Sequence, residues 1–221
     1  VFAAKVALFK DDLKAILAYS TISHLGLITM LLGTGTAFGA MAAVFHILNH
    51  ATFKAALFMS AGIIDHGAHT RDIRRLGGLR KLMPVTFIIA SLAALSMAGI
   101  PLLNGFLSKE MMLEETYATV LFGMPWLVPA LATFGSIFSA AYCFRLIGHV
   151  FFGPVRDDYP AAPHDPNLGL WLPPAILVVL VVVIGLAPFV AEPFVKLVTA
   201  SVLGDAATLP DVHIKIWHGL V

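Results

Sequence analysis

Residues 45–62 read FHILNHATFKAALFMSAG. It is mostly apolar, yet His46, His50 and Lys54 recur at every fourth position. At about 100° per residue these three side chains share one face of a helix, with a drift of about 40° per step. The surrounding apolar run, residues 38–64, is long enough to cross a bilayer, which takes about 20 apolar residues. Because ionisable groups in a membrane are costly, we expect this stripe to face a bundle interior or a water-filled path.

The stripe predicts a proton relay, because histidine changes charge near neutral pH and a buried lysine can exchange protons. Asn49 lies beside it as a possible secondary site residue. Two alternatives remain. A polar seam could simply hold helices together, and H-x-x-x-H on a helix can bind zinc. No Glu follows His46 and no third ligand is evident, so we expect neither a metal nor a cofactor.

The composition of the whole chain agrees with a membrane protein. Of 221 residues, 59% are apolar and 12% are charged, whereas soluble domains have about a quarter charged residues. The net charge of +1 argues against a nucleic-acid partner, and the high apolar content excludes a disordered chain. The lone Cys143 excludes a disulfide framework. Because no nucleophile elbow, P-loop or dinucleotide fingerprint occurs, we expect a transporter rather than an enzyme.

Apolar runs predict an all-α polytopic bundle of about five transmembrane helices, one of them broken. The expected spans are residues 13–33, 38–64, 84–122 with interruptions, 126–152 and 168–188. Pro84 suits the first turn of a helix, where its missing N–H costs nothing. The shorter apolar stretch 189–203 fits either an interfacial helix or the margin of the last span.

Basic residues in the connections set the expected topology. They form three groups: Lys5 and Lys10; Arg71, Arg74, Arg75, Arg80 and Lys81; and Arg145 with Arg156. Five crossings place all three groups on one side, which the positive-inside rule identifies as the cytoplasm. The proline-rich residues 153–167 then form a cytoplasmic loop. We expect a multi-pass protein of the bacterial inner membrane.

The run 99–105, GIPLLNG, interrupts the third span. Proline removes an intrahelical hydrogen bond, and unwound backbone at membrane depth is tolerated only inside protein or beside a cavity. Lys109 follows this break and is the strongest candidate site residue, with Asn104 and Glu110 as secondary candidates. The alternative is that Lys109 snorkels to the interface. We expect Glu114 and Glu115 to lie nearer the outer surface, in solvent.

Two further ionisable residues lie in the first span. Lys14 fits either a cytoplasmic anchor or the inner mouth of a path. His24 taken alone is more typical of helix packing, and it is a secondary site candidate. Because the sequence opens and closes within apolar stretches, we interpret it as an internal fragment of a longer polytopic protein.

Three segments resemble the membrane domain shared by respiratory complex I and Mrp-type cation/proton antiporters. They are DDLKAILAYSTISHLG at 11–26, residues 45–62, and MAGIPLLNGFLSKEMML at 97–113. Within this superfamily the chain most resembles the A-type subunit of the Mrp antiporter, through RDIRRLGGLRKLMPVTF at 71–87, LNGFLSKE at 103–110 and IKIWHG at 214–219.

The resemblance implies a bundle of two inverted five-helix repeats, each with a broken helix. Residues 1–152 match most of the second repeat, and residues 168–221 add one transmembrane helix and an interfacial or outer segment. The positions that match the family's half-channel and polar axis are Lys14, His46, His50, Lys54 and Lys109. Glu110 matches the acidic neighbour of the broken-helix lysine. The family usually has a double proline where this chain reads Pro101 and Leu102.

The resemblance further implies a membrane component of a multisubunit cation/proton antiporter that exchanges H⁺ with a monovalent cation, Na⁺. Its partners would be the bilayer and other subunits of a hetero-oligomeric complex. One alternative is a proton-translocating subunit of complex I or a related redox-driven pump, where the chain would be part of a translocase. A second is a helical scaffold that transports nothing.

Overall fold

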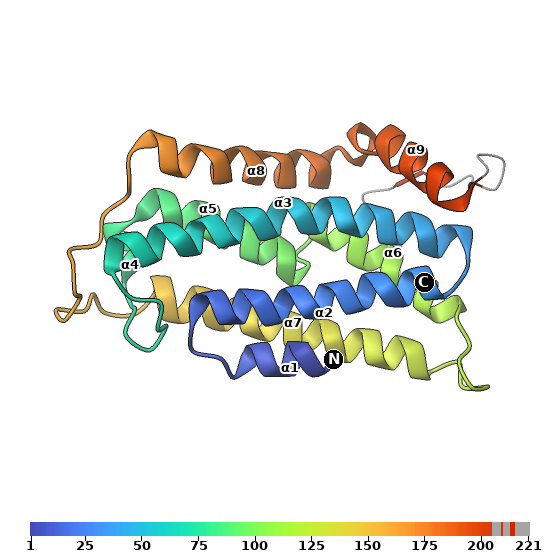
Figure 1. Ribbon diagram of the computed structural model, residues 1–221, viewed down its shortest axis with the longest axis horizontal. Coiled ribbons are helices and arrows are strands. Elements are labelled where there is room, and N and C mark those ends of the chain that lie inside the picture. The colour runs from blue at the N-terminus through green and yellow to red at the C-terminus, as the bar shows by residue number, and fades with distance from the viewer. Residues whose placement is uncertain (205–208, 210–212, 215–221) are drawn as a thin grey trace.

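A computed structural model describes residues 1–204, 209 and 213–214. Every regular element among these residues is helical (Figure 1). The elements are α1 (Phe2–Leu8), α2 (Leu13–Gly33), α3 (Ala37–Ala68), α4 (Leu79–Leu82), α5 (Pro84–Ala98), α6 (Asn104–Ala118), α7 (Leu127–Phe151), α8 (Leu168–Leu186), the 3₁₀ turn η1 (Pro188–Val190) and α9 (Glu192–Leu203).

The long helices run along the long axis of the molecule (Figure 1). In the described part of the chain, α2, α3, α7 and α8 are long and apolar enough to cross a membrane, and α5 is a shorter apolar helix. The expected third span is the pair α5 and α6, separated by the predicted break. The fold class is therefore confirmed as a polytopic helical bundle with one broken helix. Helix α3 is the centre of the bundle and packs against α2, α5, α6, α8 and α9.

The sequence specifies where the helices begin. Asp12 and Thr36 cap α2 and α3 by accepting hydrogen bonds from the backbone N–H groups of Ala15 and Gly39. Pro84 occupies the first turn of α5, as expected. Such caps satisfy N–H groups that have no partner within the helix.

The start of α5 has an additional cap from a distant loop. Asp165, in the segment between α7 and α8, accepts hydrogen bonds from the backbone N–H groups of Val85 and Thr86 at 2.8 and 3.0 Å. Tyr159 of the same segment donates to the carbonyl of Gly77. Burial raises the pKa of the Tyr159 hydroxyl. The loop is thus tied to the end of the bundle at which α5 begins.

The break between α5 and α6 has a defined geometry. Gly99 ends α5 with φ 90°, and Leu102 also has positive φ, at 73°. A side chain at Gly185 of α8 would overlap the carbonyl of Leu102, so α8 packs directly on the break. One proline and two residues with positive φ are therefore enough to interrupt this helix.

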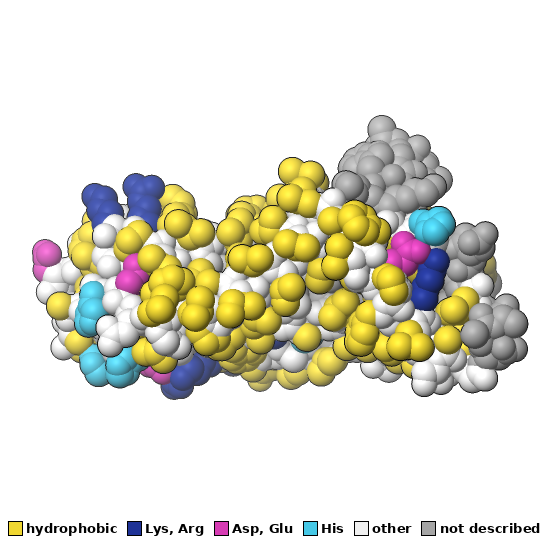
Figure 2. Space-filling model, turned by 90° about the horizontal axis from the view of Figure 1, so that it is seen from above, with side chains coloured by type: hydrophobic (Ala, Val, Ile, Leu, Met, Phe, Trp, Pro, Cys, Tyr) yellow, Lys and Arg dark blue, Asp and Glu magenta, His cyan; other side chains and the backbone are white. Residues whose placement is uncertain are grey.

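Residues of all three basic groups meet at one end of the bundle. Arg145 at the end of α7 donates to Asp11 and to the carbonyl of Lys10, and Arg74 lies 3.4 Å from Asp11. Figure 2 shows basic side chains at the end where α4 and the loops lie, and a broad apolar surface along the middle. The hydrogen bond from the Arg74 guanidinium lowers the pKa of Asp72 in this region to about 2.

The stretch 189–203 is a separate element and not a continuation of α8. The turn η1 precedes α9, whose 12 residues are fewer than the roughly 20 needed to cross a bilayer. Val195 and Thr199 of α9 are buried, while Phe194 and Leu197 are exposed. The terminal motif IKIWHG lies outside the described residues except for its first residue, Ile214.

Candidate functional site

The stripe on α3 faces the bundle interior. Lys54 is 5% exposed, and its ammonium group donates to the hydroxyl of Ser20 on α2. It also lies 3.5 Å from the carbonyl oxygen of Leu17 and 3.1 Å from the sulfur of Met97. The amine therefore joins α2, α3 and the end of α5 in the middle of the bundle.

His46, two helical turns earlier in the stripe, is fully buried between two helices. Its Nε2 lies 3.0 Å from Nδ1 of His24 on α2, and its Nδ1 lies 2.9 Å from the hydroxyl of Ser108 on α6. The rings of His24 and His46 are stacked, with centroids 5.2 Å apart. His24 is thus part of the polar interior and more than a packing group.

Lys109 lies beside the break and is 6% exposed. Its ammonium group donates to the carbonyl of Ala98, the last residue of α5, at 3.1 Å and to the hydroxyl of Ser139 on α7 at 3.2 Å. Carbonyls at a helix C-terminus carry partial negative charge, which favours a cation there. These contacts place Lys109 inside the bundle, so it does not snorkel to the interface.

Two residues of α7 that the sequence does not single out, Ser139 and Tyr142, link Lys109 to the histidines. The hydroxyl of Tyr142 on α7 lies 3.4 Å from Nε2 of His24 and donates to Ser139 at 3.1 Å. A continuous line of polar contacts therefore runs Lys109, Ser139, Tyr142, His24, His46, Ser108. Four helices, α2, α3, α6 and α7, contribute to this line, which we call the polar line.

His50 lies beside the polar line. Its ring centroid is 5.3 Å from that of His24 and 5.5 Å from that of Phe53. Its Nε2 is buried and has no hydrogen-bond partner among the described residues. A buried polar atom of this kind is normally hydrogen-bonded to protein or to ordered water.

Asn49 and Asn104 form the joint that holds the start of α6. The side-chain amide of Asn104 donates to Asn49 Oδ1 and to Thr52 at 3.0 Å each, and Asn49 donates to the backbone carbonyl of Asn104. Ser96 of α5 donates to Asn104 Oδ1 at 2.7 Å and accepts from the backbone N–H of Gly105. Through these hydrogen bonds, the two asparagines hold α5 and α6 in place against α3.

Lys14 lies apart from the polar line, towards the basic end. Its ammonium group forms an ion pair with Asp65 of α3 at 2.8 Å, and the side chains are 40% and 33% exposed. Asp65 was not among the expected site residues, because the expected span ended one residue earlier. The pair forms a charged, partly solvated group where α2 begins and α3 ends.

The acidic residues of α6 divide into three cases. Glu110 is half-buried next to Lys109, and Glu114 is exposed as expected. The expected exposure of Glu115 to solvent was wrong: this side chain is 3% exposed and accepts a hydrogen bond from Thr36 at 2.6 Å. Thr36 caps the N-terminus of α3, where partial positive charge favours a carboxylate.

Among the described residues, no group of three or more His, Cys, Asp or Glu could hold a metal ion.

The site is a series of polar and titratable side chains that contact one another inside an apolar bundle. Amines, imidazoles and hydroxyls, which can pass protons along hydrogen bonds, are lined up in an apolar bundle. The fold and the polar line together define the class: a polytopic membrane protein with a buried chain of titratable groups beside a broken helix.

Comparison with known proteins identifies the family. Residues 1–139 match the family model described as NADH:quinone oxidoreductase/Mrp antiporter, TM, and the chain belongs to this family. The A/B subunit of a probable K(+)/H(+) antiporter of Rhizobium meliloti (strain 1021) is 50% identical over 218 residues, which cover 98% of this chain and 22% of the relative.

Two further matches are also to antiporter proteins. The A1 subunit of a Na(+)/H(+) antiporter of Staphylococcus aureus (strain JH9) is 40% identical over 96% of this chain and 29% of its own length. A chain in the structure of the Mrp complex from Dietzia sp. DQ12-45-1b matches with a TM-score of 0.84 and 36% identity, over 100% of this chain and 23% of that chain. The chain thus spans about a quarter of the length of these proteins.

Proposed function

We propose that the chain is part of the A-type subunit of a multisubunit monovalent cation/proton antiporter of the Mrp type, in the bacterial inner membrane. The matches to the A1 and A/B subunits of two antiporters support this proposal. Residues 1–152 would be most of a second antiporter repeat, and the remaining subunits of the complex would be its partners.

The observation that carries the proposal is the polar line from Lys109 to Ser108. A scaffold needs no continuous series of titratable groups, because buried charge and unpaired polarity cost free energy in a membrane. Here Lys109, Tyr142, His24 and His46 are all buried and linked through hydrogen bonds of 2.9–3.4 Å.

In the proposed mechanism, protons or cations enter from the basic end, near the ion pair of Lys14 and Asp65. Lys54 and the histidines carry charge through the middle of the bundle. Lys109 is the station on the far side of the helix break. Each lysine alternates between charged and neutral forms as neighbouring charges move, since a nearby like charge favours deprotonation.

The proposed coupled cation is Na⁺. One relative belongs to an antiporter named for Na(+)/H(+) exchange and another to a probable K(+)/H(+) antiporter, so both ions belong in the assay. The test uses the full-length protein in its assembled complex, in inverted vesicles, with the pH change on adding NaCl or KCl as the readout.

The decisive variants are Lys109→Ala and Lys109→Arg. Arginine keeps the positive charge but cannot give up its proton, so we expect both variants to lose exchange by roughly 100-fold or more with normal assembly. Lys5→Ala, at an exposed lysine of α1, is the matched control and should keep full exchange. Normal exchange in Lys109→Arg would remove Lys109 from the proton path.

A redox-driven proton pump related to complex I is the second candidate, because the family model covers both kinds of protein. It predicts that the complex shows no cation-dependent exchange and instead moves protons when a redox donor is supplied. That result would overturn the antiporter proposal while leaving the polar line as the proton path.

A further inference from the structure

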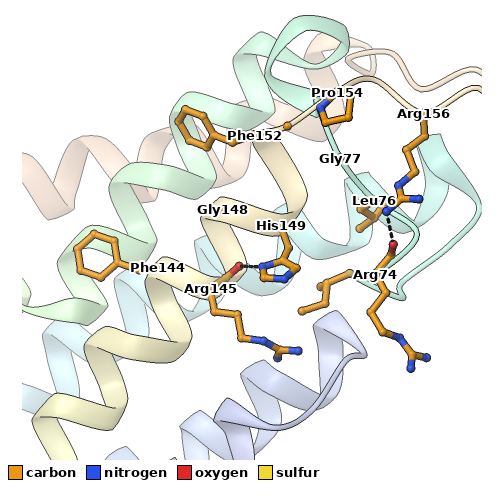
Figure 3. Close-up of a pocket in the computed structure, with 12 residues that line it drawn as sticks. Arg74, Leu76, Gly77, Phe144, Arg145, Gly148, His149, Phe152, Pro154 and Arg156 are labelled. Atoms are coloured by element: carbon orange, nitrogen blue, oxygen red, sulfur yellow. Dashed lines mark hydrogen bonds between the residues drawn. The ribbon is translucent and has the colours of Figure 1, made fainter.

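A pocket at the basic end of the bundle lies outside the polar line. Figure 3 shows it between the end of α7 and the loop that follows α3. Its volume is about 480 Å³. The residues that line it are Ile73, Arg74, Leu76, Gly77, Phe144, Arg145, Gly148, His149, Phe152, Gly153, Pro154 and Arg156.

The charge of the lining has one sign. The lining contains three arginines and one histidine: Arg74, Arg145, Arg156 and His149. None of the twelve lining residues, all of which belong to the described part of the chain, is acidic. Contacts from outside the lining hold two of the arginines in place: Arg145 pairs with Asp11, and Arg74 pairs with Asp72 at 2.7 Å.

Arg156 differs from the other two arginines, because Asp72 engages Nε and Nη2 of Arg74, and the carbonyl of Lys10 and Asp11 engage Nη1 and Nη2 of Arg145. Arg156 reaches across the pocket and uses Nη2 to donate to the backbone carbonyl of Arg74 (Figure 3). A guanidinium carries five N–H donors in a fork that matches phosphate oxygens. The remaining N–H groups of Arg156 can therefore bind a phosphate group, and Arg74 and Arg145 add positive charge to this side of the pocket.

The other side of the pocket is apolar. Phe144 and Phe152, on α7 and at its end, are 52% and 41% exposed, and Phe144 lies on the part of the helix that leads towards the apolar middle of the molecule. Between them Gly148 has no Cβ, and a Cβ built there would meet open space. A ligand that fits both sides has an anionic head and an apolar tail.

We propose that this pocket binds the phosphodiester headgroup of an anionic phospholipid, with an acyl chain lying along Phe144. The basic end is where headgroups meet a membrane protein, and basic pockets between helices on that side suit anionic lipids. This site is separate from the polar line and does not depend on the transported ion.

The test measures lipid retention by the full-length protein in its purified complex. Native mass spectrometry would count bound phosphatidylglycerol and phosphatidylcholine after delipidation and addition of each lipid. Inorganic phosphate, titrated as a competitor, distinguishes a phosphate site from a lipid site. The pocket variants are Arg156→Gln, which removes one charge, and Gly148→Leu, which fills the cavity without changing charge.

Matched controls are Arg75→Gln, an exposed arginine of the loop after α3 that does not line the pocket, and Gly26→Leu, an exposed glycine of α2 with open space around it. We expect roughly fivefold weaker phosphatidylglycerol retention in Arg156→Gln and a larger loss in Gly148→Leu, with both controls unchanged. Phosphatidylcholine should bind at least roughly fivefold more weakly than phosphatidylglycerol throughout.

Three results would overturn the proposal. Equal retention of phosphatidylglycerol and phosphatidylcholine would show that the pocket does not distinguish an anionic headgroup from a zwitterionic one. Competition by millimolar inorganic phosphate as effective as by lipid would identify a soluble phosphate ligand instead. Unchanged phosphatidylglycerol retention in Gly148→Leu, in a folded and assembled complex, would show that lipid binds elsewhere.

Discussion

The hydroxyl of Tyr142 links His24 to Lys109, two residues that are 85 positions apart in the sequence. It contacts His24 directly and Lys109 through Ser139. Tyr142→Phe removes this hydroxyl and keeps the ring, so packing in the buried site should persist. We expect cation-dependent exchange to fall roughly tenfold or more, because the hydrogen-bonded line is cut. Initial rates of pH change in vesicles, normalised to the amount of assembled complex, would measure the loss.

Tyr117→Phe is the matched control, since Tyr117 is 71% exposed. It should exchange at the rate of the unmodified protein. An unchanged rate in Tyr142→Phe would mean that protons reach Lys109 by another route, for example through the Ser20 and Lys54 contact.

At this scale the sequence predicts which side chains are costly but not which ones they meet. His46, Lys54 and Lys109 are conspicuous because charge is rare in apolar helices. Ser139 and Tyr142 are not, because hydroxyls occur throughout α7 and only the packing of α7 against α2, α5 and α6 selects these two. Asp65 has a readable signal, an acid near the end of an apolar run, but its partner Lys14 is 51 residues away.

Among the elements, the joint between α5 and α6 is packed most tightly at Gly105. A Cβ at this position would overlap the backbone carbonyl of Ser96, and backbone cannot move aside cheaply. We therefore expect Gly105→Ala to displace the start of α6, with a loss of roughly 1–3 kcal/mol of stability. The amount of assembled complex and its thermal unfolding temperature would measure this.

Gly26→Ala is the control for the element, because a Cβ there meets open space and alanine favours helix. Full stability in Gly105→Ala would mean that the two half-helices are not held as closely as their hydrogen bonds indicate. Gly105→Ala and Gly26→Ala together separate crowding at the break from a general effect of removing glycine.

The helices themselves follow from simple sequence patterns. Apolar length and the proline at Pro84 predict most boundaries to within a few residues, and the structure adds caps at Asp12 and Thr36. The GIPLLNG run predicts the break, but not that α8 would press Gly185 against it, because that contact depends on the path of the chain after α7. Glu115 was misjudged for the same reason: its partner, Thr36, belongs to another helix end.

Over the whole molecule, the basic end is held together by ion pairs between distant segments. Arg145 bonds both Asp11 and the carbonyl of Lys10, which joins the end of α7 to the connection before α2. Arg145→Lys keeps the charge but loses the fork geometry, so we expect about 1–3 kcal/mol of lost stability. The thermal unfolding temperature of the purified complex would report it.

The matched change Arg75→Lys, at an exposed position in the same basic region, should leave the unfolding temperature unchanged. Equal unfolding temperatures for Arg145→Lys and the unmodified complex would show that a single amine suffices for this joint. The positive-inside pattern predicts that these residues share one side, but not that Asp11 would be their meeting point.

The broken helix also has a consequence for how the protein is made. Helices α5 and α6 have 15 residues each, about 22 Å, so neither alone spans a hydrocarbon core of about 30 Å. Helix α6 carries Lys109 and three glutamates, which makes it a poor substrate for insertion by itself. Its partners Asn49 and Thr52 on α3 are synthesised earlier. Membrane entry of α6 therefore depends on a helix that is already in place, and the order of synthesis becomes part of the folding pathway.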